Sequence, residues 1–147
     1  MTYSLRFLLI SFIIVLTALT GFSQIPHSVA KPNETVWVIA NSVKANKRAQ
    51  YERFVHEIFW PGAKNLSAAE QKTFTQTRIM HPTKPETDGS YTYLFIMDPV
   101  IKGADYSIES VLKKQYGVQK GKEYFKLFTD AVIEKNSKSY EMTQSKD

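Results

Sequence analysis

The chain has 147 residues and a mass of 16.9 kDa, with 43% hydrophobic and 22% charged residues. This length fits one globular domain, and the apolar and aromatic content excludes a disordered chain. The absence of cysteine excludes disulfides and thiolate metal centres, and the net charge of +5 comes from dispersed basic residues, which excludes a concentrated nucleic-acid-binding patch.

The N-terminal segment has the pattern of a secretory signal peptide. Residues 7–22 (FLLISFIIVLTALTGF) carry no charge and follow a single basic residue, Arg6. Such an apolar stretch is short for a membrane span, which needs about 20 residues. Gly21 and Ser23 are small residues suited to cleavage after Ser23. We therefore predict a signal peptide over 1–23 and export to the periplasm or the medium, with a retained membrane anchor as the alternative.

The rest of the chain is predicted to hold one folded domain. Its parts are a proline-containing linker over 24–34, a domain over 35–144 and a polar tail over 145–147. The domain begins with a strand over 35–42 (TVWVIANS), which is apolar on both faces and should be covered on both. Apolar residues at helical spacing then predict an amphipathic helix over 47–60, ended by the following Pro-Gly pair.

The middle of the domain is predicted to contain a short helix and two strands. Ser67 and Glu70 match a capping box, which predicts a helical turn starting at the residue after Ser67. Alternating β-branched residues predict a strand over 73–81. An Asp-Gly turn separates this strand from a third one over 91–98, which is the most hydrophobic and should lie at the sheet centre.

The C-terminal part is predicted to form two helices and a last strand. The first helix is capped by Asp105 and closed by Gly117, the second includes 124–132, and a weak strand covers 139–143. The order strand, helix, strand, strand, helix pair, strand predicts an α+β fold of the ferredoxin-like type. In this fold a four-stranded antiparallel sheet carries helices on one face only, so the other apolar face needs a cover.

The element order and the strands that are apolar on both faces resemble the dimeric α+β barrel superfamily, which includes antibiotic-biosynthesis-monooxygenase-like and haem-degrading proteins. The resemblance spans 35–144 and implies a homodimer, in which two sheets form a barrel. It also implies a small-molecule pocket between each sheet and its own helices. The sequence departs from the haem-degrading members, because no His or Trp follows His81 to supply the axial ligand. No cofactor and no metal are therefore predicted.

Two polar residues are candidates for proton transfer. Asn41 lies near the end of the first strand, where haem-degrading members carry a site asparagine; the other interpretation is a polar strand end entering a turn. Glu52 and His56 stand four residues apart on the first helix, where a carboxylate can orient an imidazole base. The other interpretation of this second pair is a surface contact. The candidate catalytic residues are therefore Asn41 and His56.

Several aromatic residues and one arginine are candidates for ligand contact. Aromatic rings can line an apolar pocket, and they can equally fill a core or an interface. Arg78 lies on a strand face that should be covered, so its guanidinium needs either a ligand anion or an acidic partner such as Asp98 or Glu141. The candidate ligand-binding residues are Trp37, Arg78, Tyr93 and Tyr116, with Tyr91 and Tyr106 in the same aromatic set.

These observations favour an exported, dimeric domain that binds a small apolar or aromatic ligand, with no nucleic-acid partner and membrane contact only through the signal segment before cleavage. One alternative is a cofactor-independent monooxygenase-like enzyme of the same superfamily. The other is a structural or partner-binding dimer with a filled core. A cavity under the helices favours the first two, and a titratable group such as His56 inside it favours the enzyme.

Overall fold

A computed structural model describes residues 29–146 of the chain. The predicted signal peptide and residues 24–28 of the predicted linker lie outside the described residues. Between residues 29 and 146, no helix is both long enough and apolar enough to cross a bilayer.

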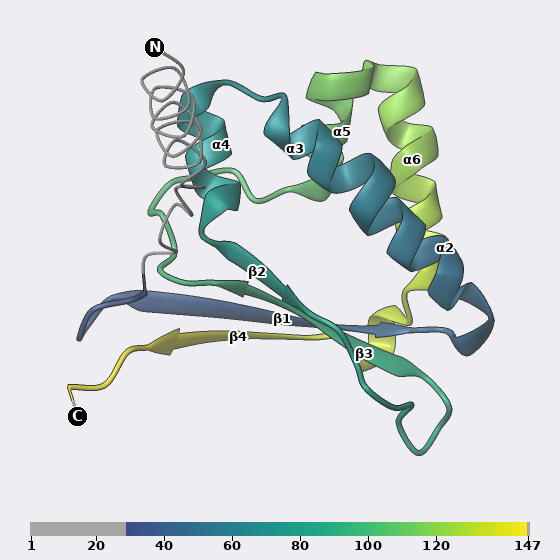
Figure 1. Cartoon of the computed structure of the whole chain (residues 1–147), viewed down its shortest axis with the longest axis horizontal. Helices are drawn as coiled ribbons and strands as arrows, with labels where there is room; N and C mark the ends of the chain where they lie inside the picture. The colour runs from purple at the N-terminus through teal and green to yellow at the C-terminus, as the bar shows by residue number, and fades with distance from the viewer. Residues whose placement is uncertain (1–28, 147) are drawn as a thin grey trace, which may run out of the picture.

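Four antiparallel strands form one sheet in the order β2-β3-β1-β4 (Figure 1). The strands are β1 (Thr35–Val43), β2 (Thr77–Met80), β3 (Tyr91–Met97) and β4 (Lys138–Thr143). The two longest strands, β1 and β3, are central, as predicted for the third strand, and their register pairs Ile39 with Phe95. The bounds of β1, β3 and β4 agree with the prediction to within one residue. The α+β class is confirmed, and the topology is compatible with a ferredoxin-like fold.

The helices cover one face of this sheet (Figure 1). They are α2 (Arg48–Arg53), the π-helical segment η2 (Phe54–Phe59), α3 (Trp60–Lys64), α4 (Ala68–Thr75), α5 (Ile108–Tyr116) and α6 (Val118–Ala131), with 3-10 turns η1 (Ala45–Lys47) and η3 (Glu134–Asn136). In β3 alternate residues are buried beneath them, namely Tyr93, Phe95 and Met97, and Val43 of β1 is buried as well. Period-two alternation in β3 therefore sets which of its side chains enter the core.

The prediction that Pro61 and Gly62 end the first helix is wrong, because helical structure continues to Lys64. Pro61 lies in the first turn of α3, directly after the π-helical segment η2, where a proline without an N–H is tolerated. Gly62 packs closely on α5: a Cβ at this position would lie 3.1 Å from Cε2 of Tyr116. The Tyr116 hydroxyl donates a 2.8 Å hydrogen bond to the Ile58 carbonyl, which joins α5 to this long helical segment.

The prediction of a strand over 73–81 is wrong in its first half. The capping box of Ser67 and Glu70 is present as predicted, and the helix that it starts, α4, runs on to Thr75. Phe74 packs on Phe59 and Trp60 with ring centroids 5.8 and 6.4 Å apart, and burial of this ring favours the helical conformation. The strand β2 is therefore limited to four residues.

The N-cap of α5 is Ser107 and not the predicted Asp105. Ser107 Oγ accepts a 3.2 Å hydrogen bond from the backbone N–H of Ser110. Asp105 supports this cap from outside the helix, since its Oδ1 accepts the N–H of Ser107 at 2.9 Å. Gly117 ends α5 as predicted, with a φ of +80°, a conformation that favours glycine.

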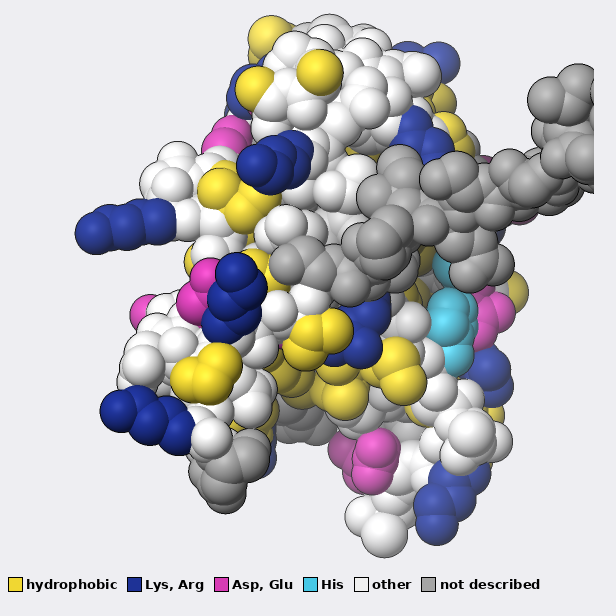
Figure 2. All heavy atoms as spheres, turned by 60° about the vertical axis from the view of Figure 1, so that its left-hand side comes forward, with side chains coloured by type: hydrophobic (Ala, Val, Ile, Leu, Met, Phe, Trp, Pro, Cys, Tyr) yellow, Lys and Arg dark blue, Asp and Glu magenta, His cyan; other side chains and the backbone are white. Residues whose placement is uncertain are grey.

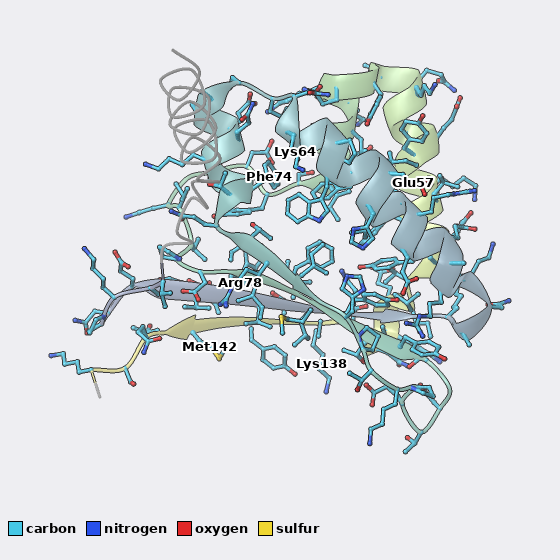
Figure 3. All side chains as sticks on the ribbon, viewed as in Figure 1. Glu57, Lys64, Phe74, Arg78, Lys138 and Met142 are labelled. Atoms are coloured by element: carbon cyan, nitrogen blue, oxygen red, sulfur yellow. The ribbon has the colours of Figure 1, made fainter. Side chains whose placement is uncertain are left out.

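The sheet face away from the helices carries mainly apolar side chains. Met80, Tyr140 and Met142 are 52%, 46% and 48% exposed, and hydrophobic side chains gather near the middle of the view in Figure 2, beside Lys and Arg. Met142 and Lys138 point away from the helical layer (Figure 3). The register places the half-buried Val36, Val38, Ala40, Leu94 and Ile96 on the same face. Within the described chain, no helix covers this face.

Candidate functional site

A cavity of about 290 Å³ lies between the sheet and the helical layer. Its lining comes from β1, β2 and β3 below and from η2, α4, α5 and α6 above, so it is assembled by segments far apart in the sequence. Most of the lining is apolar or aromatic. The lining residues are Ile39, Asn41, Phe59, Phe74, Thr77, Phe95, Met97, Tyr106, Ser107, Ile108, Glu109, Phe125 and Phe128. Figure 3 shows Phe74 in the space between the helices and the sheet.

Burial distinguishes the floor of this cavity from its rim. Phe95 and Met97 of β3 are buried and form the floor, Phe59 is buried above them, and Ser107 at the start of α5 is exposed. Glu109 on the same turn is half-buried and forms an ion pair with Lys113, with Nζ 2.7 Å from Oε1. The cavity is therefore deepest at the sheet and reaches solvent beside the first turn of α5.

Asn41 is the one candidate catalytic residue that lines this cavity. It is buried on the helix-facing side of β1, and its Nδ2 donates a 3.2 Å hydrogen bond to the hydroxyl of Tyr51. Burial raises the pKa of Tyr51, so this hydroxyl stays protonated. Among the described residues, the Asn41 side-chain oxygen accepts no hydrogen bond. Asn41 can therefore offer an acceptor to a molecule in the cavity.

His56 lies outside the cavity. Its exposed ring stacks on His81, with centroids 5.1 Å apart and ring planes inclined by 12°. Glu52 does not contact His56 as hypothesised. It accepts a 3.0 Å hydrogen bond from Nε of Arg48. The π-helical segment η2 begins between Glu52 and His56, and its wider turn changes the relative direction of these two side chains.

Tyr93 belongs to a polar network at the edge of the core, and it does not line the cavity. Its buried hydroxyl donates a 2.5 Å hydrogen bond to Glu52 Oε1. Burial and this carboxylate raise the pKa of Tyr93 to about 12, while the Tyr93 hydroxyl holds the pKa of Glu52 below its usual range. The guanidinium of Arg48 completes the network by lying 4.4 Å from the centroid of Tyr91.

Arg78 lies on the open sheet face, where it pairs with Asp98. The distance from Nη2 to Oδ2 is 2.6 Å, and the other carboxylate oxygen of Asp98 accepts the backbone N–H of Ala30 at 2.7 Å. The sequence left open whether Arg78 pairs with a ligand anion or with an acidic residue, and the structure shows the acidic residue Asp98. This pair ties residue 30 to the ends of β2 and β3.

Trp37 and Tyr116 also lie outside the large cavity. Trp37 borders a separate, smaller pocket at the other end of β1, and its indole N–H donates to Ser139 Oγ. Tyr116 packs edge to face on Tyr124 at 4.9 Å, and burial raises its pKa. Of the predicted site residues, the structure thus brings Asn41 to the cavity, together with Tyr106 from the wider aromatic set.

Most of the cavity lining is not evident from the sequence pattern. Phe125 and Phe128 of α6 reach it together with Ile39 of β1. One usable signal was Asn41 itself, a polar residue within an otherwise apolar alternation on β1. The other was an excess of aromatic residues on α6 beyond those a single apolar stripe requires.

No protein-family model, curated protein or solved structure matches the chain. In the part of the chain that the structure describes, no three His, Asp or Glu side chains are grouped to hold a metal ion. The fold and the cavity define the class: a small α+β protein with a four-stranded antiparallel sheet, helices on one face and an apolar pocket between the layers.

Proposed function

We propose that this protein binds a small apolar or aromatic molecule in the cavity between the sheet and the helices. The observation that carries the proposal is the cavity itself, about 290 Å³ in volume and lined mainly by aromatic and aliphatic side chains. Ligand pockets in proteins combine such a lining with a few polar groups that fix orientation. Asn41 on the floor and Glu109 near the rim are two such groups.

The volume supports a ligand of one or two rings. It lies at the lower end of the range for small-molecule sites, about 300 to 1,000 Å³. An apolar cavity of this size gains free energy when a ligand replaces poorly hydrogen-bonded water. The side-chain oxygen of Asn41 is available as an acceptor, which favours a ligand that carries one O–H or N–H donor.

We propose further that the protein is exported and acts as a homodimer, in which the open sheet faces of two copies pack into an α+β barrel. Support for export comes from residues 1–23 alone. Support for dimerisation comes from the mainly apolar open face, because monomeric proteins rarely expose apolar patches larger than a few hundred Å². A symmetric pair of sheets would cover this face on both copies.

The lining favours binding over the monooxygenase alternative. Proton transfer needs a titratable group within hydrogen-bond reach of the substrate. His56 lies outside the cavity, and the acidic residue in the lining, Glu109, is neutralised by Lys113. The third alternative, a structural dimer, requires a filled interior, and the presence of the cavity argues against it.

Fluorescence of N-phenyl-1-naphthylamine, a neutral two-ring probe that brightens in apolar surroundings, tests the proposal. The wild-type protein should bind one probe molecule per chain. Ile39→Phe should weaken binding at least tenfold, because the larger side chain enters the cavity from β1. Val38→Phe is the matched control, since it makes a similar enlargement on the opposite face of the same strand.

Two results would overturn the proposal. The first is a folded wild-type protein, verified by circular dichroism, that does not bind the probe. The second is binding that Val38→Phe weakens and Ile39→Phe leaves unchanged, because the probe would then lie on the open face. Native mass spectrometry of the purified protein would report any co-purifying ligand and the oligomeric state together.

A further inference from the structure

Another pocket, of about 220 Å³, lies at the start of β1 and shares only Tyr106 with the lining of the proposed ligand cavity. Its walls are two aromatic rings, one carboxylate and a short loop with small side chains. The lining residues are Thr35, Trp37, Val100, Ile101, Gly103, Ala104, Tyr106 and Glu141. This lining contains no Lys, Arg or His, so its only formal charge is the negative charge of Glu141.

The two aromatic rings meet at a right angle. The ring centroids of Trp37 and Tyr106 are 5.9 Å apart, and the angle between their planes is 89°. Both rings are held in place by polar contacts at their edges: the Trp37 indole N–H donates to Ser139, and the Tyr106 hydroxyl accepts the N–H of Ile101 at 2.9 Å. These contacts fix the rings, so little side-chain freedom is lost when a ligand binds.

Glu141 completes the pocket from the neighbouring strand. The register of β4 on β1 places it directly opposite Trp37, so both side chains lie on the same face of the sheet. Glu141 is exposed, and within residues 29–146 it forms no ion pair. A carboxylate therefore stands beside two aromatic rings, and both the carboxylate and the ring faces are sources of negative potential.

We propose that this pocket binds the methylated ammonium group of a small organic cation. Aromatic faces attract such a group through the ring quadrupole, and perpendicular rings with a nearby carboxylate contact it from three sides. A methylated ammonium fits better than a primary one, because its methyl groups can pack on the two aromatic rings, whereas –NH₃⁺ needs three hydrogen-bond acceptors around it. The proposal does not depend on the ligand of the larger cavity.

Choline and its neutral carbon isostere, 3,3-dimethylbutan-1-ol, test the proposal, because they have nearly the same shape and differ in charge. In titrations of the purified protein followed through the Trp37 indole N–H resonance, choline should bind about tenfold more tightly than the isostere. Glu141→Gln should weaken choline binding about threefold and leave binding of the isostere unchanged. Glu134→Gln is the matched control, because it removes the same charge from the exposed residue at the start of η3.

Glu141→Gln should leave the fold intact, because every residue of β4 is exposed. Trp37→Leu should reduce choline binding at least tenfold in a protein that still binds N-phenyl-1-naphthylamine. Equal binding of choline and the isostere, no binding of choline, or equal effects of Glu141→Gln and Glu134→Gln would each overturn the proposal.

Discussion

Gly121 of α6 lies directly against the backbone of α5. A Cβ built on Gly121 would lie 2.7 Å from the backbone nitrogen of Lys113 and 2.8 Å from its Cα. Both distances are shorter than real Cβ contacts, and the opposing atoms are backbone, which cannot move aside by changing a rotamer. Gly121→Ala must therefore push the two helices apart.

The size of the effect follows from two opposing contributions. Forcing extra volume into a well-packed contact typically costs about 1–3 kcal/mol. Replacing glycine by alanine inside a helix stabilises the folded state by up to about 1 kcal/mol through helix propensity. The free energy of unfolding of Gly121→Ala should therefore fall by about 1–2 kcal/mol, a substantial part of the ordinary stability of a small domain.

Urea unfolding followed by circular dichroism measures this difference, and Gly62→Ala is its matched control. A Cβ at Gly62 would contact the end of the Tyr116 side chain at 3.1 Å, where a ring can shift by a few tenths of an ångström. Gly62→Ala should therefore stay within about 1 kcal/mol of the wild type. If Gly121→Ala proved as stable as the wild type, or Gly62→Ala the more damaging change, the proposed close contact of α5 and α6 would be refuted.

Three further predictions concern polar contacts and the open face. The hydroxyl of Tyr93 lowers the pKa of Glu52, so the ionised carboxylate stabilises the fold at pH values above its usual pKa. This contribution is lost as the pH falls through the lowered pKa. In urea unfolding between about pH 6 and pH 3, Glu52→Gln should therefore lose less stability than the wild type. Asp98→Ala leaves the N–H of Ala30 without its acceptor and should cost about 1–3 kcal/mol in thermal or urea unfolding, whereas Asp98→Asn keeps an acceptor and should cost less. Leu94→Lys, in the middle of the open face, should convert a dimer to a monomer in sedimentation experiments, and a wild-type protein that stays monomeric at high concentration contradicts the proposed barrel.

The strands β1, β3 and β4 were predictable because their signal is local. In β3, alternate residues differ in burial as period-two geometry requires: Tyr93, Phe95 and Met97 are buried, and the intervening Leu94 and Ile96 face the other way. The order of strands and helices then restricts the topology to few choices, since a split βαβ unit places the third strand between the first two.

The ends of the helices were harder to predict because tertiary contacts decide them. Thr73 and Phe74 have strand-like neighbours in the sequence, but the ring of Phe74 packs on Phe59 and Trp60, and this burial extends α4. Helical structure continues through Pro61 because the preceding turn is a wide π-helical one, a feature that the spacing of apolar residues does not reveal. At both places the local sequence favours an end to the helix, and tertiary packing extends the helix beyond it.

A cavity was expected only because the element order resembles a known superfamily. Most of the residues that line it were not predicted. A cavity depends on volumes that neighbouring side chains fail to fill, whereas sequence patterns report only which side chains face inward. Trp37 and Tyr93 do face inward, but Tyr93 is held by Glu52 and Trp37 borders the smaller pocket. Asn41 was identifiable because a buried polar residue in an apolar alternation needs a partner, which Tyr51 supplies.

The close helix contacts and the cavity occupy opposite ends of the α5–α6 pair. Gly121 contacts Lys113 near the turn at Gly117, whereas the cavity is lined by Ile108 at the start of α5 and by Phe128 in the second half of α6. Close packing at the joined end fixes the two helices relative to each other without filling the space at the other end. A rigid helix pair of this kind can keep a cavity open in a small domain, because the walls are held by contacts outside the cavity and a ligand need not order them.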